Sequence, residues 1–473
     1  MQVIRDSILS STNGGAVLLL KKTIIEEFAT SQNKKFVAID ELVSFNRFLS
    51  TKRYLLYKPW NPGVVRQNAL YDIFGEYSFV IHNSILDTIK KRHSISQKAL
   101  NIYYLIYLNK AVDMFNYASN NIIIKDCSIF IEDWHYIENT LLLVMNELLW
   151  QGENVFFGCH GNYYLKLAPL LKLKQNQGPY SSELGISIRA LMESKAFVKD
   201  VNEFFNQRFD NDSQMTSNTI LREQEERRIA TAGEGFSGPL ICVNVFSDSY
   251  FHIYNRLFDS EQEWLETTIS MLRESGHDFG IKLHPQIHAY KEYSEVITIL
   301  SKLNVKDKVK EGLGISHLTS SEILPITNKG GVFQERTSRH LDSIVAIPRI
   351  IDAHEGLFFR TIHDYVDELK NLRPTIKISD ENAIFCRADF FLIEEKLSFL
   401  SGIEIDEDLG VGERNATTNQ MWVDRHFQKL LDVGKVEYLI RNLDILVNGD
   451  DSFLFQTSLL NHYDVKLDRS ANE

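Results

Sequence analysis

Apolar and polar residues follow two periods along this chain, and the switches between them predict alternating strands and helices. In the first half, apolar runs of strand length lie at residues 34–40, 77–83, 127–133 and 154–161. Apolar positions three or four residues apart predict helices at residues 14–31, 99–119 and 136–152, as with Leu20, Ile24 and Phe28 in the first of them. Strands that alternate with helices are typical of a largely parallel sheet.

The alternation restarts after a polar and then glycine-rich break at residues 209–239. Strands are predicted at residues 240–248, 278–285 and 343–348, and helices at residues 260–276, 293–303, 361–372 and, as a helical tail, 422–446. Ser260 and Glu263 form a capping box at the start of one helix.

These patterns predict an α/β chain of two domains and a helical C-terminal segment. The expected parts are an N-terminal domain at residues 1–215, a linker at 216–238, a second domain at 239–395, and helices at 396–473 that pack back on the cleft or the N-terminal domain. Ligands of such sheets bind at the carboxyl ends of the strands, so a cleft between the two domains is the expected site.

Composition narrows the class of protein. Hydrophobic residues make up 44% and charged residues 24%, an ordinary globular balance, and the net charge of −12 argues against a general nucleic-acid binder. A local basic patch could still bind a charged ligand. The four cysteines, Cys127, Cys159, Cys242 and Cys386, lie far apart, which indicates buried thiols in a reducing cytoplasm. The histidines have no metal-ligand spacing, so we expect no metal site.

The sequence also predicts where the protein is located. The N-terminus lacks the pattern of a secretory leader, and no apolar run approaches the roughly 18–20 residues that span a bilayer. We therefore expect a cytoplasmic protein that is soluble or peripheral. The basic run Lys90–His93 is of a kind that usually forms a solvated face, but it could contact an anionic glycan or the inner membrane.

The first candidate site residues end the strand at residues 278–285. This strand delivers Lys282, His284 and Pro285 to its carboxyl end, where the proline stops the ladder and the histidine can donate to a phosphate oxygen. The structural alternative is a histidine that only satisfies a loop carbonyl.

A second group of candidates lies in residues 318–335, which read LTSSEILPITNKGGVFQE. Two serines precede the apolar segment, and a lysine, two glycines and a glutamate follow it: Ser320, Ser321, Lys329, Gly330, Gly331 and Glu335. The glycines permit close backbone approach, and the start of the helix expected after them suits a phosphate. The alternative is a glycine turn with an exposed glutamate and capping serines. Because all these residues fall at predicted junctions of strand and helix, we expect them on one edge of one sheet with His284.

Three segments together resemble a known family. FSDSYFHIYNRLFDSEQEWLETTISMLRES, IKLHP and LTSSEILPITNKGGVFQE look like the donor domain of bacterial capsule-polysaccharide-type glycosyltransferases of the GT-B fold, over residues 240–372. Related sialyl- and Kdo-transferases bind a CMP-sugar through a His-Pro motif and a Ser/Thr motif. The resemblance implies that His284 and Pro285 match the first motif, that Ser320 and Ser321 match the second, and that Glu335 binds the nucleotide ribose.

The same transferases carry an Asp/Glu-Asp/Glu-Gly motif that supplies the catalytic base. This chain has Glu132, Asp133 and then Trp134 where the glycine would stand. A carboxylate that ends a strand there could take the proton of an acceptor hydroxyl, although Asp133 could equally be a helix cap. Asp248, at the end of another predicted strand, is the rival base and could also be a cap.

A further loop could line the acceptor side. It consists of Asn13, Gly14 and Gly15, which could also be an ordinary helix start.

The resemblance implies a fold of two Rossmann-like domains facing a cleft, and an inverting, metal-independent glycosyltransferase without a cofactor. Its donor would be a nucleotide-sugar, CMP-linked rather than UDP-linked by preference, and its acceptor a surface glycan or glycolipid such as capsule or lipopolysaccharide. Other interpretations stay open. They are a nucleotide-sugar epimerase or a polyol-phosphate transferase on the same fold, and a non-catalytic protein that binds glycan or nucleotide.

Overall fold

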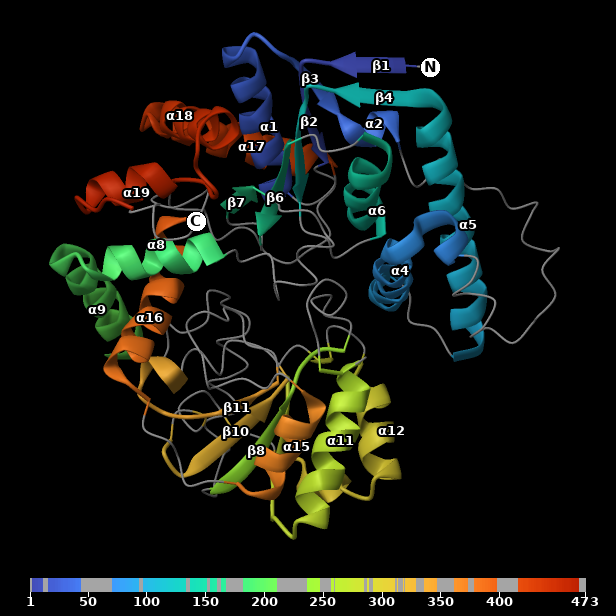
Figure 1. Ribbon diagram of the computed structural model, residues 1–473, viewed down its shortest axis with the longest axis vertical. Helices are drawn as coiled ribbons and strands as arrows, with labels where there is room; N and C mark the ends of the chain where they lie inside the picture. The colour runs from blue at the N-terminus through green and yellow to red at the C-terminus, as the bar shows by residue number, and fades with distance from the viewer. Residues whose placement is uncertain are drawn as a thin grey trace. The chain divides into compact units, whose positions relative to one another are not determined.

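The structure is a computed structural model, and it describes the chain in segments. The described residues are 2–11, 16–43, 70–92, 97–132, 137–150, 154–159, 163–166, 182–210, 236–246, 257–258, 260–284, 287–288, 292–310, 313, 318, 320–328, 336–346, 361–372, 378–397 and 416–467. The chain forms two compact units (Figure 1). The first comprises residues 1–179 and 393–459, and the second comprises residues 180–392 and 460–473.

The first unit contains a five-stranded sheet with the order β3-β2-β5-β6-β7. Its strands are β2 (Ser7–Ser11), β3 (Lys35–Ala38), β5 (Ser128–Glu132), β6 (Asn154–Cys159) and β7 (Tyr163–Lys166). The first four run parallel, and β7 pairs antiparallel with β6. The earliest strand, β2, therefore lies between β3 and β5, as in doubly wound α/β sheets.

Two strands of this sheet, β2 and β5, are each preceded in the chain by another short strand, and a kink of one or two residues separates the two strands in both cases. β1 (Gln2–Arg5) pairs parallel with β4 (Ile122–Lys125), and these strands lead into β2 and β5. Asp6 and Asp126 stand at the two kinks with φ of 46° and 56°, a left-handed conformation that Asp tolerates better than most residues.

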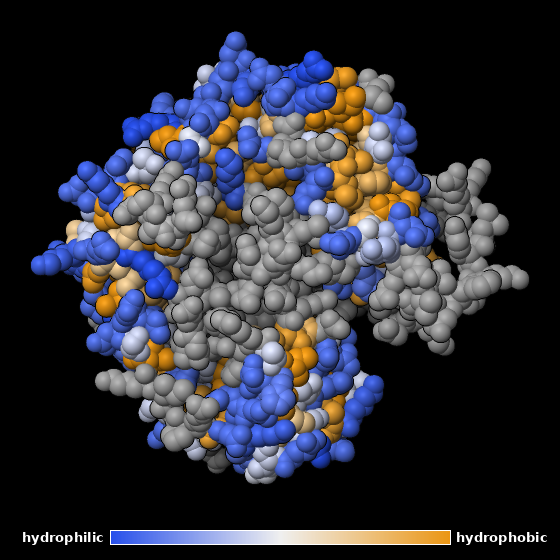
Figure 2. Space-filling model, in the orientation of Figure 1, coloured by the Kyte–Doolittle hydropathy of each residue, from blue (hydrophilic) through white to orange (hydrophobic). Residues whose placement is uncertain are grey.

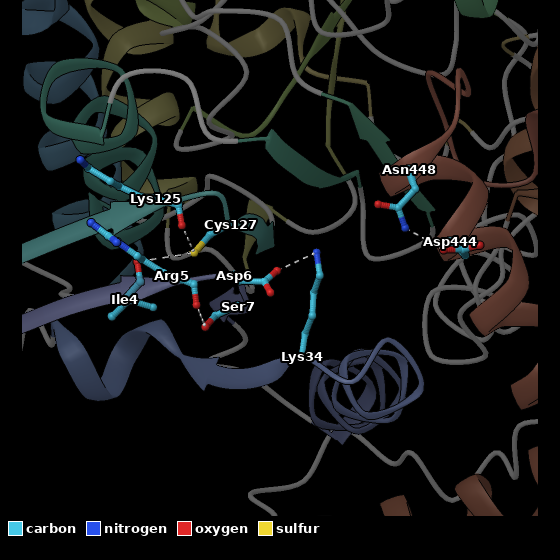
Figure 3. A network of polar contacts seen from close by, with 9 residues as sticks. All are labelled: Ile4, Arg5, Asp6, Ser7, Lys34, Lys125, Cys127, Asp444 and Asn448. Carbon is cyan, nitrogen blue, oxygen red and sulfur yellow. Dashed lines mark hydrogen bonds and ion pairs between the residues drawn. The ribbon is translucent and has the colours of Figure 1, made fainter.

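A side chain fixes each kink by bonding to the carbonyl two residues earlier (Figure 3). Ser7 Oγ donates to Arg5 O at 2.8 Å, and Cys127 Sγ lies 3.2 Å from Lys125 O. The pair of kinks thus lets both strands turn together without losing their pairing.

Helices flank this sheet on both sides in Figure 1. α1 (Ala16–Ser31), α17 (Ala416–Asp432) and α18 (Lys435–Asn448) pack together on one side, and α4 (Ser78–Arg92), α5 (Gln97–Asn121) and α6 (Ile137–Met145) on the other. Short elements complete the unit: α2 (Ile39–Leu42), η3 (Gly75–Tyr77) and the π-helical turn η4 (Asn146–Trp150). Leu20, Ile24 and Phe28 are fully buried, which confirms the predicted apolar stripe of α1.

One strand prediction in this unit is wrong. Residues 77–83 belong to η3 and the helix α4 instead of a strand. Ile81, Ile85 and Ile89 are all 0% exposed, so the buried positions recur every fourth residue. A short apolar run such as 77–83 does not distinguish a buried helix from a strand, and here the longer period decides.

The second unit contains a four-stranded parallel sheet with the order β11-β10-β8-β9. Its strands are β8 (Gly238–Val243), β9 (Gly280–Leu283), β10 (Ile323–Thr327) and β11 (Ile344–Val345). The earliest strand, β8, again has the second strand on one side and the third on the other. The four parallel strands of each unit therefore follow the same order.

The large apolar core of this unit lies on one face of its sheet. Ile241, Ile281 and Ile326 pack there with residues of α11 (Glu261–Glu274), α12 (Tyr293–Lys302) and α15 (Ile362–Lys370). The exposed residues of α11 are polar, namely Gln262, Glu263, Arg273 and Glu274. The lower part of Figure 2 shows a largely hydrophilic surface with smaller hydrophobic patches. Ser260 Oγ accepts from Glu263 N–H at 3.1 Å, which confirms the predicted cap of α11. The core also holds a paired polar group, because Tyr365 Oη bonds to Trp264 Nε1 and Thr268 Oγ1, each at 2.8 Å.

A layer of helices belongs to the second unit as well. It contains α8 (Ser182–Met192), α9 (Lys195–Asp210) and α16 (Asp380–Phe391), followed by η8 (Leu392–Lys396); the short turn η7 (Lys306–Lys308) follows α12. The sequence assigned residues 180–215 to the first domain, whereas α8 and α9 pack on α16. Phe197 and Phe204 of α9 contact Phe391 of α16, so apolar packing joins these helices to the later part of the chain. Residues 216–235 of the expected linker lie outside the described residues.

The C-terminal residues are divided between the units. α17 and α18 belong to the first unit, and α19 (Gln456–His462) begins in the first and ends in the second. Within the second unit, Tyr463 Oη donates to Asp200 Oδ2 at 2.8 Å.

Two predictions from composition can be compared with the structure. Cys127, Cys242 and Cys386 are buried thiols that form no disulfide, as expected, and the side chain of Cys159 lies outside the described residues. None of the described helices combines the length and the apolar character needed to cross a membrane.

Candidate functional site

The carboxyl edge of the second sheet is the candidate site. Because β8, β9 and β10 run parallel, their carboxyl ends lie on the same edge. The chain moves from β8 to β9 on one side and later to β10 on the other, which makes the ends of β8 and β10 a topological switch point. Ligands of open α/β sheets bind at such points. Polar residues at these strand ends include Thr327, the last residue of β10, and Asn244, His284 and Asn328, which directly follow β8, β9 and β10.

Side-chain hydrogen bonds tie these strand ends together. Asn244 Nδ2 donates to Thr327 Oγ1 at 3.4 Å, which joins the ends of β8 and β10. Glu292 Oε2 accepts from Phe246 N–H at 2.5 Å, which joins the segment after β8 to the start of α12. Glu292 is itself buried, so this charge-assisted bond lies away from solvent.

His284 begins a turn that leads to Glu292, the residue whose side chain bonds to Phe246 N–H. Ile287 N–H donates to His284 O at 3.0 Å, and Glu292 N–H donates to Ile287 O at 3.1 Å. The His284 side chain is half-buried at the carboxyl edge, as the sequence predicted. Pro285 lies outside the described residues.

Lys282 lies in a row of side chains across three strands. In the sheet register Cys242 stands opposite both Thr327 and Lys282, so the three share one face. Burial raises the pKa of the Cys242 thiol to about 12, and the charges of Lys282 and Arg336 oppose that shift. Cys242 is therefore a neutral thiol at physiological pH, and Lys282 and His284 are basic side chains at this edge.

Asn328 is the least satisfied polar residue of the edge. Its side chain is 0% exposed, and neither Oδ1 nor Nδ2 has a hydrogen-bond partner among the described residues. Burying a polar group without a partner costs about 1–3 kcal/mol, so such groups need an explanation.

Ser320 and Ser321 do not join this site. They precede β10, whose first residue Ile323 stands opposite Gly238 at the start of β8. The serines thus lie at the amino edge of the sheet, and β10 separates them from His284 by roughly 13–17 Å along the strand. The prediction that His284 and the two serines share one edge is wrong, because the serines stand before a strand and not after it.

Ser320 has a structural role at that amino edge. Its Oγ accepts from Glu322 N–H at 3.2 Å, and its carbonyl accepts from Arg336 Nη1 at 2.8 Å. Arg336, which is 0% exposed, also donates to Leu318 O at 2.5 Å and, through Nε, to Asp342 O at 2.6 Å. Burial lowers the pKa of Arg336 to about 10, and the charge of Asp342 opposes that shift. The guanidinium stays charged at neutral pH and fastens the amino ends of β10 and β11.

The first sheet has its own switch point, between β2 and β5. β5 ends at Glu132, the backbone of which pairs with Gly158, and Gly158 pairs with Tyr164. Lys21 of α1 is 0% exposed and places its Nζ 5.0 Å from the centroid of the Tyr164 ring. This buried lysine therefore packs on β7, two strands across the sheet from the end of β5.

The remaining predicted site residues lie outside the described residues. They are Asn13, Gly14, Gly15, Asp133, Asp248, Lys329, Gly330, Gly331 and Glu335. The described strands show which edges these residues follow in sequence. Residues 13–15 come after β2, Asp133 after β5, Asp248 after β8, and Lys329 after β10.

Comparisons with known proteins add no relative: no family model, no curated protein and no solved structure matches this chain. Function is therefore inferred from the site itself.

Sequence reasoning missed Asn244, Asn328 and Glu292. The two asparagines were detectable, since each directly follows a buried apolar strand in LICVN and ILPITN. Glu292 carried no such signal because its contact with Phe246 spans 46 residues.

Proposed function

We propose that this chain is a glycosyltransferase of the GT-B class, with two Rossmann-like domains, that uses a nucleotide-sugar donor. The two units support this proposal because each contains parallel strands in the same doubly wound order. In this proposal the second unit binds the donor, a CMP-sugar by preference and a UDP-sugar otherwise. The first unit binds the acceptor, a bacterial surface glycan or glycolipid.

The polar carboxyl edge of the second sheet carries the proposal. Lys282 and His284 end β9 beside the switch point of β8 and β10, and hydrogen bonds through Asn244 and Glu292 hold the neighbouring strand ends. A cationic side chain and a histidine placed there can offset the charge of a departing nucleotide phosphate without a metal. Ser320 and Ser321 have no part in this version of the donor site.

The proposed reaction is a direct displacement with inversion. A carboxylate accepts the proton of the acceptor hydroxyl, whose oxygen forms a bond to the anomeric carbon as the bond from that carbon to the phosphate oxygen breaks. Asp133, Glu132 and Asp248 are the proposed bases, each at or after the carboxyl end of a central strand.

Incubation of the purified chain with CMP- and UDP-sugars, with and without glycan acceptors, tests this function. We expect sugar transfer that depends on the acceptor. Asp133→Ala or Asp248→Ala should remove this transfer without loss of nucleotide binding. Conversion of the donor without an acceptor would identify an epimerase instead. Nucleotide binding without any turnover would identify a binding protein, and neither binding nor turnover would refute a nucleotide-dependent function.

A further inference from the structure

Asn328 and Asn442 are both 0% exposed, yet their carboxamides differ completely in their contacts. In the first unit, Asn442 Nδ2 donates to Tyr438 O at 2.7 Å, and its Oδ1 accepts from Ser458 Oγ at 2.5 Å. Neither polar atom of Asn328 has a partner among the described residues. The fold thus satisfies one buried carboxamide and leaves the other unpaired.

The unpaired group stands at the switch point. Asn328 directly follows β10, one residue after Thr327, which accepts a hydrogen bond from Asn244 of the neighbouring strand end. Ser10 and Ser343 also have buried, unpaired hydroxyls. Each of those leaves one rotatable hydroxyl unpaired, whereas Asn328 leaves a donor and an acceptor unpaired together.

The chemistry of the carboxamide restricts its partner. A phosphate presents only acceptors, so it could pair with Nδ2 and would leave Oδ1 unpaired. A partner for both atoms must offer a donor and an acceptor side by side. The edge of a nucleobase does so, and asparagine pairs with base edges through both atoms; neighbouring ribose hydroxyls present the same combination.

We propose that Asn328 binds the nucleoside part of the nucleotide through two hydrogen bonds, and so determines which donor this site accepts. This inference rests on the proposed donor site and assigns the phosphate to Lys282 and His284. The unfavourable burial of Asn328 in the free protein is then relieved when the nucleoside binds, because the ligand supplies both missing partners.

Calorimetry tests the proposal by measuring how the wild type and two Asn328 variants bind CMP, UMP, ribose 5-phosphate and inorganic phosphate. The melting temperature of each ligand-free protein is measured as well. Asn328→Leu is close in size and removes both polar atoms, and Asn328→Asp keeps the shape and loses the donor. We expect Asn328→Leu to weaken nucleotide binding at least tenfold, Asn328→Asp to weaken it less, and inorganic phosphate to bind all three proteins alike. The free Asn328→Leu protein should melt no lower than the wild type, because an unpaired polar group has been removed.

Asn442→Leu is the matched control, since it breaks two existing hydrogen bonds. It should lower the melting temperature and leave nucleotide affinity unchanged. An equal loss of ribose 5-phosphate affinity in Asn328→Leu would identify the ribose hydroxyls as the partner, and a loss confined to CMP and UMP would identify the base. If Asn328→Leu melts lower and binds nucleotide as the wild type does, a buried water is the partner and the proposal is wrong. A wild type that binds none of the four ligands would refute the donor site as well.

Discussion

The described polar residues at the two edges of the second sheet differ in their contacts. At the amino edge, Arg336 donates to three backbone carbonyls and Ser320 Oγ accepts from a backbone N–H. Arg336 Nη2 and Ser343 Oγ have no partner there among the described residues. At the carboxyl edge, Lys282 and His284 are half-buried, and Asn328 is buried without a partner. The difference supports the proposal that the carboxyl edge binds a ligand, while the described bonds of Arg336 and Ser320 stabilise the amino edge of the sheet.

The largest effect that we expect concerns Arg336. Arg336→Met leaves three carbonyls without their donor and should destabilise the protein by about 3 kcal/mol, since each bond to a charged donor contributes about 1.5–3 kcal/mol and the desolvated charge offsets part of the sum. Urea denaturation measures the loss of unfolding free energy. Arg336→Lys is the comparison variant, because it keeps the positive charge but lacks the planar guanidinium group that donates several hydrogen bonds. Nucleotide affinity of the folded fraction should not change. A loss below about 1 kcal/mol would show that the amino edge does not depend on this residue.

The next effect is on binding at the opposite edge. His284→Ala or Lys282→Ala should weaken nucleotide binding about tenfold, the loss expected for one charge-assisted hydrogen bond to phosphate. Stability should change by less than about 1 kcal/mol because both side chains are partly exposed. His288→Ala, in the same turn but with an exposed side chain, is the matched control. Equal affinities for all four proteins would remove Lys282 and His284 from the site.

A smaller effect distinguishes the two edges directly. Ser320→Ala removes one exposed hydrogen bond to Glu322 N–H and should cost about 0.5–1 kcal/mol. Titration with CMP should give the wild-type affinity, because the serine lies at the amino edge. A tenfold weaker affinity would instead support the motif assignment made from sequence and contradict the present separation of the edges.

The smallest effect concerns an ion pair at the amino edge. Asp278 precedes β9, and Lys308 Nζ lies 2.6 Å from its Oδ1; the hydrogen bond and charge of Lys308 lower the pKa of Asp278. A carboxyl whose pKa is lowered by folding stabilises the protein above its unfolded pKa and loses that contribution as the pH falls through its folded pKa. Asp278→Asn should therefore be slightly less stable than the wild type at pH 7 and equal to it near pH 2, by urea denaturation. A difference that does not depend on pH would exclude the ion pair as its cause.

Sequence patterns predicted most of the fold because they report local burial. The stripe of α1, the cap at Ser260 and the strands β3, β5, β6, β8, β9 and β11 follow from residues close together in the chain, whereas β2 was not predicted and residues 323–327 were described only as an apolar segment. The structure of residues 77–83 was predicted wrongly, because a seven-residue apolar run fits both a strand and a helix. The spacing of Ile81, Ile85 and Ile89 distinguishes the helix only over a longer range.

The candidate site was less predictable because it depends on strand order and direction. His284 could be placed since a proline marks the end of its strand, whereas Ser320 was placed on the wrong edge because the strand begins after it. The contact of Glu292 with Phe246 and the unpaired state of Asn328 are properties of packing, and no local pattern reports them.

Hydrogen–deuterium exchange in the presence and absence of CMP tests the contrast between the edges most directly. The nucleotide should protect amides at the carboxyl edge, in peptides covering residues 240–246, 280–284 and 323–328, and leave those of residues 336–343 at the amino edge unchanged. Protection confined to residues 336–343, or none in either group at saturating CMP, would contradict a nucleotide site at the carboxyl edge of the second sheet.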